Sequence, residues 1–104
     1  MPSTVFSSLS GQKTTICVNG RFNFELFSRF RTACLMEGLE GKGVRHIVID
    51  LSGTECIDSS GMDILLFMRD EMGTRMASME MINARPELRH ALEVACFHRL
   101  FKIT

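Results

Sequence analysis

The chain has 104 residues, which is close to the commonest size for one domain and too short for two separate cores. Twelve basic residues balance twelve acidic ones, so no basic excess points to nucleic-acid binding. No apolar stretch approaches the ~20 residues that span a bilayer, and the first ten residues lack a secretory-signal pattern. We therefore expect one cytoplasmic domain over residues 1–104, with no direct nucleic-acid binding and no membrane insertion.

The first part of the chain predicts a hairpin followed by a helix. Thr4–Leu9 and Thr14–Val18 are rich in β-forming residues, and the intervening Gly11-Gln12-Lys13 is typical of a turn. Asn23 is a suitable N-cap for a helix over Phe24–Glu37, where apolar residues recur at helical spacing. The glycines expected to end this helix in a loop are Gly38, Gly41 and Gly43.

The rest of the chain alternates predicted strands with predicted helices. His46–Leu51 is a continuous apolar run, typical of a central strand covered on both faces, and Ser52–Ile57 is expected to be a loop. A helix then runs from Asp58 to about Met72, and Gly73 stops it. The later elements are a strand at Met76–Ile82, a helix at Pro86–Cys96 and a short strand at Leu100–Ile103.

The predicted order is therefore β-β-α-β-α-β-α-β. Strands that alternate with helices imply right-handed crossovers and parallel pairing, whereas the opening hairpin is antiparallel. The sequence thus predicts an α/β fold with a mixed sheet.

The cysteines and histidines form no recognisable site. The four cysteines contain no C-x-x-C pair, and the three histidines lack metal-ligand spacing, so we expect neither a metal nor a cofactor. Free, buried thiols in a reducing compartment are the expected state. No phosphate loop and no hydrolase or metalloprotease motif is present, so we expect no enzyme. The residues concerned are Cys17, Cys34, Cys56, Cys96, His46, His90 and His98.

The start of the second predicted helix is the most informative segment. Asp58-Ser59-Ser60-Gly61 places two hydroxyls in a first turn, where backbone N–H groups are unpaired and the helix dipole is positive. A phosphate is tolerated there and would add about −1.5 to −2 charges. A structural interpretation stands beside this one, because Asp58, Ser59 and Ser60 are all preferred N-caps. Ser60-x-x-Asp63 also resembles a capping box, and the residue types alone favour capping.

The faces of this helix differ in character. At about 100° per residue, Met62, Leu65, Met68 and Met72 gather on one side, whereas Phe67 falls on the other. Phe67 is either an incidental surface residue or a partner anchor, because aromatic residues are enriched at interface hot spots. Met62, at the helix start, belongs either to the core or to the surface.

These residues resemble the STAS domain family and, within it, the bacterial anti-sigma factor antagonists. The resemblance is clearest in Ile47–Gly61, an Ile-Val-Ile-Asp-Leu-Ser strand followed by a loop and Asp-Ser-Ser-Gly. Val18–Phe22 resembles the family's second strand and the turn into its first helix, and Leu88–Ile103 resembles its last helix and strand. The resemblance implies a four- to five-stranded sheet with helices mainly on one face.

The resemblance also implies a phosphorylation switch. The unphosphorylated antagonist binds an anti-sigma factor, often a serine kinase of the histidine-kinase-like ATPase type. That partner phosphorylates the serine before the glycine, here Ser60, and a serine phosphatase restores the active form. The partner-binding residues expected on this basis are Asp58, Ser59, Ser60, Gly61, Met62, Asp63 and Phe67.

The resemblance leaves a second function open, and the chain departs from the family at three positions. STAS domains also serve as accessory subunits of transporters, including phospholipid transport ATPases. Cys96 and His98 stand where many members carry Gly and Asp, so the turn after the last helix is expected to differ. Asp63 stands where a small or apolar residue is common.

Overall fold

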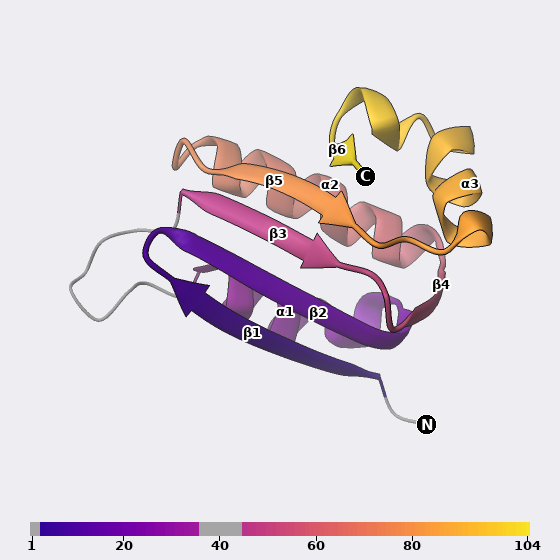
Figure 1. Ribbon diagram of the computed structural model, residues 1–104, viewed down its shortest axis with the longest axis horizontal. Coiled ribbons are helices and arrows are strands. Elements are labelled where there is room, and N and C mark those ends of the chain that lie inside the picture. The colour runs from indigo at the N-terminus through magenta and orange to yellow at the C-terminus, as the bar shows by residue number, and fades with distance from the viewer. Residues whose placement is uncertain (1–2, 36–44) are drawn as a thin grey trace.

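The computed structural model describes residues 3–35 and 45–104, and Figure 1 shows the arrangement of its elements. The labels of Figure 1 are kept throughout, with η denoting a 3-10 helix. In chain order, the elements are β1 (Thr4–Ser10), β2 (Lys13–Phe22), η1 (Phe24–Leu26), α1 (Phe27–Leu35), β3 (His46–Asp50), β4 (Thr54–Ile57), α2 (Ser59–Gly73), β5 (Ser78–Ile82), α3 (Pro86–Val94), η2 (Phe97–Arg99) and β6 (Lys102–Ile103).

The six strands form one mixed sheet with the order β1-β2-β3-β5-β6, and β4 pairs with the far end of β2. The hairpin β1–β2 is antiparallel, and the other pairs are parallel. The long strand β2 has two successive partners. Its first half pairs with β3, its register shifts between Gly20 and Arg21, and its last residues pair with β4. This bend lets β4 deliver the chain to the start of α2.

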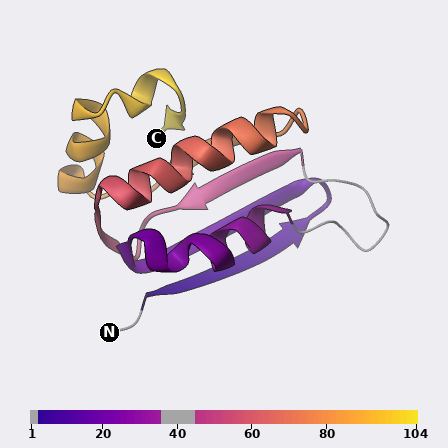
Figure 2. The same cartoon turned by 180° about the vertical axis from the view of Figure 1, so that it is seen from behind.

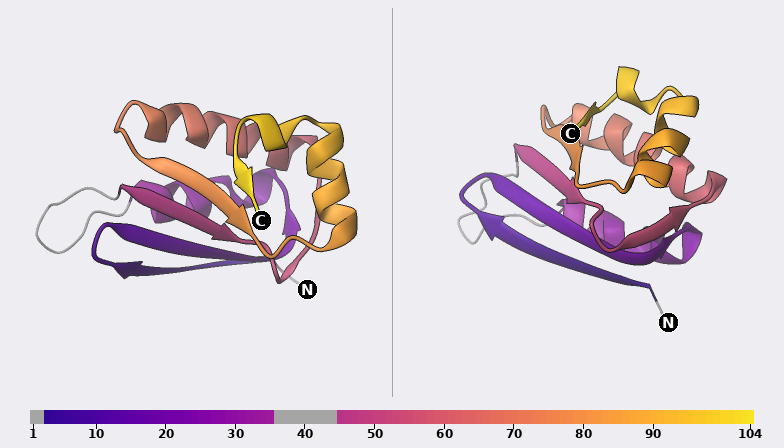
Figure 3. Two further views of the ribbon diagram at one scale, coloured as in Figure 1. Left: turned by 45° about the horizontal axis from the view of Figure 1, so that its top comes forward. Right: turned by 45° about the vertical axis from the view of Figure 1, so that its right-hand side comes forward.

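Helices α1 and α2 lie side by side on one face of the sheet, which Figure 2 shows from behind. The other face carries no helix among the described residues, and α3 lies at the end of the sheet, where it contacts β4 (Figure 3). The core fills the space between the covered face and the two helices. Its fully buried large side chains are Ile16, Phe22, Leu26, Phe30, Ile47, Ile49, Leu51, Leu65, Met68, Met72, Met81 and Leu92.

The fold class, the mixed sheet and the placement of helices mainly on one face are confirmed, with two corrections to the strands. Ser52–Ile57 was expected as a loop, but Thr54–Ile57 forms β4, so the sheet has a strand that the predicted order lacks. This segment has few apolar residues and no alternating pattern, so the sequence does not indicate a strand. The strand forms by pairing with β2. Strand β3 is central, as predicted, but helices cover one of its faces. Val48 is buried on the other face between Thr15 and Glu80 of the neighbouring strands.

The remaining differences are shifts in element boundaries. Strand β2 extends to Phe22, beyond the predicted Val18, whereas β5 and β6 begin two residues later than predicted, at Ser78 and Lys102. The predicted helix from Phe24 begins as η1, capped by the Asn23 side chain, which accepts a hydrogen bond from the Glu25 N–H. It continues as α1 to Leu35, and Glu37, with the three glycines expected to follow it, lies outside the described residues. The last helix ends at Val94 instead of Cys96, because the chain turns into η2.

The turn after α3 is made at Cys96. Cys96 adopts the left-handed conformation with φ 62°, which glycine adopts without steric cost and other residues rarely adopt. Cysteine therefore occupies a turn position whose conformation glycine adopts more easily.

Candidate functional site

The start of α2 is held by Asp58, which is the N-cap of the helix. Its Oδ1 atom accepts a hydrogen bond from the Gly61 N–H at 2.9 Å and another from the Ser60 hydroxyl at 2.6 Å. These two bonds, the Ser60 bond first, hold the pKa of Asp58 below its ordinary value. Asp58 is therefore ionised at neutral pH, and its charge faces the positive end of the helix.

Ser60 joins two elements that lie far apart in the sequence. Its Oγ donates to Asp58 on α2 and accepts a hydrogen bond from the Phe24 N–H at 2.9 Å, at the start of η1. The starts of η1 and α2 therefore meet at one hydroxyl. Ser59 is exposed, and no described hydrogen bond joins its side chain to another residue. The structure thus distinguishes the two serines that the sequence placed side by side.

Gly61 makes this meeting of helix starts possible. It is buried, and a Cβ atom added there would collide with the Phe22 carbonyl oxygen and the Ile57 side chain. Asp58 also donates its backbone N–H to the Phe22 carbonyl at 3.4 Å. The first turn of α2 therefore packs directly on the end of β2, and this fixes the position of Ser60.

An apolar groove of about 380 Å³ begins at Ser60 and lies between η1–α1 and α2. Phe24 and Phe27 form its wall on the side of η1–α1, and their ring centroids lie 5.7 Å apart. Phe67 faces them from α2, with its ring edge-on to Phe27 at 5.6 Å. Ile64 and Asp63 complete the lining.

The candidate residues from the sequence are only partly brought together. Ser60, Asp63 and Phe67 line the groove, and Phe67 is half exposed, as the helical wheel predicts. Gly61 is buried beneath the site, whereas Met62 is partly buried and packs against the core. Of the two positions considered for Met62, core and surface, the structure favours the core.

The capping-box interpretation of Ser60-x-x-Asp63 is wrong. Asp58 caps the helix, and the Asp63 side chain makes no hydrogen bond or ion pair within residues 3–35 and 45–104. Two carboxyl groups in the first turns compete for the same N–H donors, and Asp58 is the one placed outside the helix. Asp63 is therefore free to act at the surface.

Phe24 and Phe27 are functional candidates that the sequence analysis missed. Both precede α2 by more than thirty residues, and only the fold places them beside Ser60. Phe24 is 66% exposed, which is unusual for a side chain at a helix start that has apolar neighbours. The available signal was the pair Phe24 and Phe27 at i, i+3 directly after a capping Asn23.

The cysteines lie apart from the groove, and the expectation that all are buried is wrong. Cys34 is buried between α1 and the sheet, and burial raises the pKa of its thiol to about 12. Cys17 is partly buried, whereas Cys56 and Cys96 are exposed. Within the described residues, no cluster of three or more metal-ligating side chains forms.

Residues 10–104 match the STAS domain family, which covers most of the fold and the whole site described above. The chain belongs to the STAS domain family. A STAS-domain containing protein of Pseudomonas aeruginosa (strain UCBPP-PA14) is 36% identical over 104 residues, with both chains covered completely.

Solved structures of two kinds of protein share this STAS fold. The anti-sigma factor antagonist SpoIIAA of Bacillus, in its unphosphorylated form, matches with a TM-score of 0.76 and 16% identity, over 97% of this chain and 88% of that one. A sulfate transporter family protein from Wolinella succinogenes matches with a TM-score of 0.78 and 16% identity, over 92% of this chain and 79% of that one. In the described part of the chain, the helices are too short or too polar to cross a membrane.

Proposed function

We propose that this STAS domain is an anti-sigma factor antagonist that binds a partner protein through the start of α2 and the adjoining groove. In this proposal, reversible phosphorylation of Ser60 weakens the complex. The observation that carries it is the position of Ser60, whose hydroxyl lies both at the N-terminus of α2 and at the end of the apolar groove. The proposed protein is a binding module and not an enzyme.

Phosphorylation of Ser60 would change both the hydrogen bonds and the charge at the start of α2. A phosphate on Oγ removes the hydrogen that Ser60 donates to Asp58 and places about −1.5 to −2 charges beside that carboxylate. N–H groups at the helix start stabilise the phosphate while it is exposed to water. A partner that covers the groove has to desolvate both anions, which is unfavourable unless it supplies matching charges.

The proposed partners are an anti-sigma factor or a serine kinase of the histidine-kinase-like ATPase type, together with a serine phosphatase. The similarity to SpoIIAA, which is known in unphosphorylated and phosphorylated forms, supports this assignment. The exposed aromatic residues beside Ser60 support it independently, because Phe24 and Phe67 provide the kind of surface that partner proteins bury.

A second candidate is an accessory subunit of a transporter. The similar TM-score of the sulfate transporter family protein favours it. The two functions differ in what co-purifies with the chain and in whether Ser60 is modified. A transport ATPase that binds equally well to wild type and to Ser60→Ala supports the accessory subunit.

Phosphopeptide mapping tests the proposal. The chain is isolated from its native cells together with bound proteins, incubated with ATP and digested, and the phosphate is located by mass spectrometry. We expect one phosphate, on Ser60, and none in Ser60→Ala. Phosphate on Ser59 alone contradicts the assignment, because Ser59 lies outside the hydrogen-bond network at the groove.

A further inference from the structure

The groove beside Ser60 combines an apolar floor with an acidic rim. Its aromatic walls are Phe24, Phe27 and Phe67, and its floor includes Ile64. Of the six described residues that line it, Asp63 is the one that carries a charge. One turn beyond Phe27 and Phe67, the Arg31 guanidinium contacts the Glu71 carboxylate at 2.9 Å and joins α1 to α2. The groove therefore lies open between the helix starts and this ion pair.

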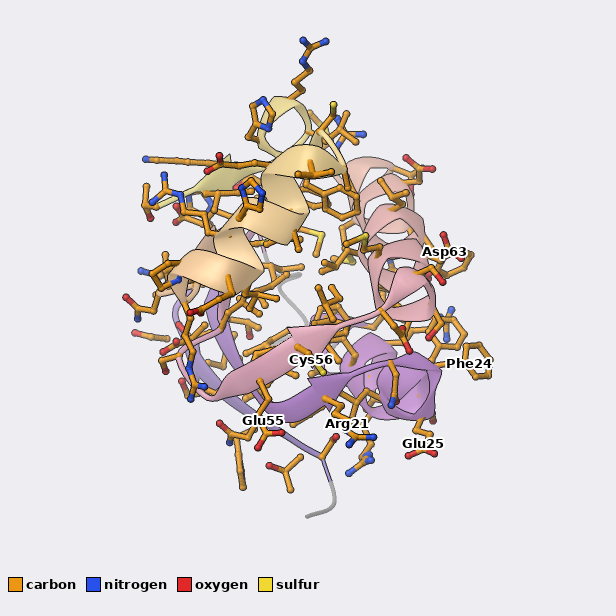
Figure 4. All side chains as sticks on the ribbon, turned by 90° about the vertical axis from the view of Figure 1, so that its right-hand side faces the viewer. Arg21, Phe24, Glu25, Glu55, Cys56 and Asp63 are labelled. Atoms are coloured by element: carbon orange, nitrogen blue, oxygen red, sulfur yellow. The ribbon has the colours of Figure 1, made fainter. Side chains whose placement is uncertain are left out.

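The rim carries one negative charge, that of Asp63, which is exposed and has no ion-pair partner among the described residues. Asp58, which contacts Ser60 at one end of the groove, is already held by two hydrogen bonds. Figure 4 shows Phe24 and Asp63 on the same side of the molecule. An incoming segment meets this acidic rim before it reaches the aromatic rings.

We propose that the groove binds a segment of a partner protein that presents one apolar side chain next to a Lys or Arg. The apolar side chain packs on the rings of Phe24, Phe27 and Phe67, and the cation faces Asp63. Half-exposed aromatic rings in a concave setting are the usual anchors of interfaces, and opposite charges at the rim select and orient the partner. The biological role rests on the function proposed above, whereas the binding itself does not.

This arrangement defines how phosphorylation of Ser60 weakens binding. The single cation of the partner faces Asp63, so the phosphate and Asp58 are still desolvated without matching charges. A further loss of affinity comes from the apolar part, and it does not depend on charge. The phosphate occupies the Ser60 end of the groove. In the unmodified chain, the Phe24 N–H donates to Ser60 Oγ and so fixes the aromatic wall. The ester oxygen of phosphoserine is a poorer acceptor for this hydrogen bond. The phosphate effect therefore persists at high salt, where the attraction of the cation is screened.

A matched pair of short peptides tests the proposal without knowledge of the natural partner. The probes are acetyl-Lys-Leu-Lys-amide and acetyl-Glu-Leu-Glu-amide, titrated into the full chain labelled at isoleucine methyl groups. We expect the cationic peptide to shift the Ile64 methyl resonance and to bind about tenfold more tightly than the acidic one, which corresponds to about 1.4 kcal/mol.

Three variants locate the binding. Phe67→Ala removes one wall and is expected to abolish the shift at Ile64. Phe6→Ala, at a somewhat more exposed ring on β1, is expected to leave the shift unchanged. Asp63→Asn is expected to lower the affinity for the cationic peptide about threefold and to leave acetyl-Leu-amide unaffected. Circular dichroism verifies that each variant is folded.

Other outcomes overturn the proposal. Equal affinity of the two peptides, or shifts that map away from Ile64, means that the groove does not select an apolar residue beside a cation. Concentration-dependent dimerisation that Phe67→Ala abolishes assigns the groove to a second copy of the chain instead. If the peptides fail but phosphorylation of Ser60 still releases the natural partner, the groove inference fails and the proposed function stands.

Discussion

The two ends of helix α2 are built in opposite ways. At its start, Asp58 caps the helix, Ser60 bonds to the distant Phe24, and buried Gly61 packs against the Phe22 backbone. At its end, Gly73 is exposed with no atom near the position of a Cβ, and the helix closes on the exposed Thr74. The difference teaches that the first turn of α2 is positioned by contacts with β2 and η1, whereas the hydrogen bonds of Gly73 and Thr74 stay within the helix end and the turn that follows it.

The largest expected effect compares the two glycines of this helix. Gly61→Ala forces a Cβ into the Phe22 carbonyl oxygen, and we expect it to lower the free energy of unfolding by about 3 kcal/mol. Gly73→Ala has open space and removes a helix-destabilising glycine, so we expect a gain of about 0.5–1 kcal/mol. Urea denaturation measures both values. Equal effects of the two substitutions would contradict the contrast between the two ends.

Removal of the shared hydroxyl has a smaller expected effect. Ser60→Ala leaves the Phe24 N–H without its acceptor and Asp58 without one donor, and we expect a loss of about 1 kcal/mol of stability. Thr74→Ala at the far end also removes a hydroxyl, which bonds only to the Glu71 carbonyl of the preceding turn. We expect that variant to stay within about 0.5 kcal/mol of wild type. If Thr74→Ala loses as much stability as Ser60→Ala, the tertiary hydrogen bonds of Ser60 contribute no more than a local one.

The smallest expected effect is the pH dependence that Asp58 introduces. The folded chain holds the pKa of Asp58 below its ordinary value of 3.8, so ionised Asp58 stabilises the fold above that pH. This stabilisation is lost as the pH falls through the lowered pKa. Asparagine is an equally good N-cap but does not titrate. We therefore expect the fall in melting temperature between pH 7 and pH 3 to be smaller in Asp58→Asn than in wild type. An identical fall in both proteins would show that the Asp58 carboxylate is not linked to folding.

The sequence alone predicts the parts of the fold that depend on local pattern. The hairpin, the capped start of α2 and the shared face of Met68 and Met72 follow from residue types and helical spacing. Strand β4 was missed because its four residues pair with the bent end of β2, and that bend has no periodic signal. The expectation that helices cover both faces of β3 is wrong for a related reason. Neighbouring strands bury Val48 without a helix.

The candidate site also divides into residues found from local sequence and residues found only from tertiary packing. Asp58, Ser60 and Phe67 belong to one segment, so their chemistry and helical phase identify them from the sequence. Phe24 and Phe27 reach the site through the packing of α1 against α2, and the bond from the Phe24 N–H to Ser60 is a tertiary contact. Local reasoning therefore finds the proposed phosphorylation site, whereas the aromatic groove beside it requires the fold.

The central claim is that the state of Ser60 controls partner binding through the start of α2. The direct test installs phosphoserine at position 60 by an expanded genetic code and titrates this protein calorimetrically against the protein that co-purifies with the unmodified chain. We expect affinity at least thirtyfold weaker than that of the unmodified chain, which corresponds to about 2 kcal/mol. Phosphoserine placed at position 59 in a parallel preparation is expected to have a smaller effect. Equal affinity of the phosphoserine-60 and unmodified proteins would contradict the account.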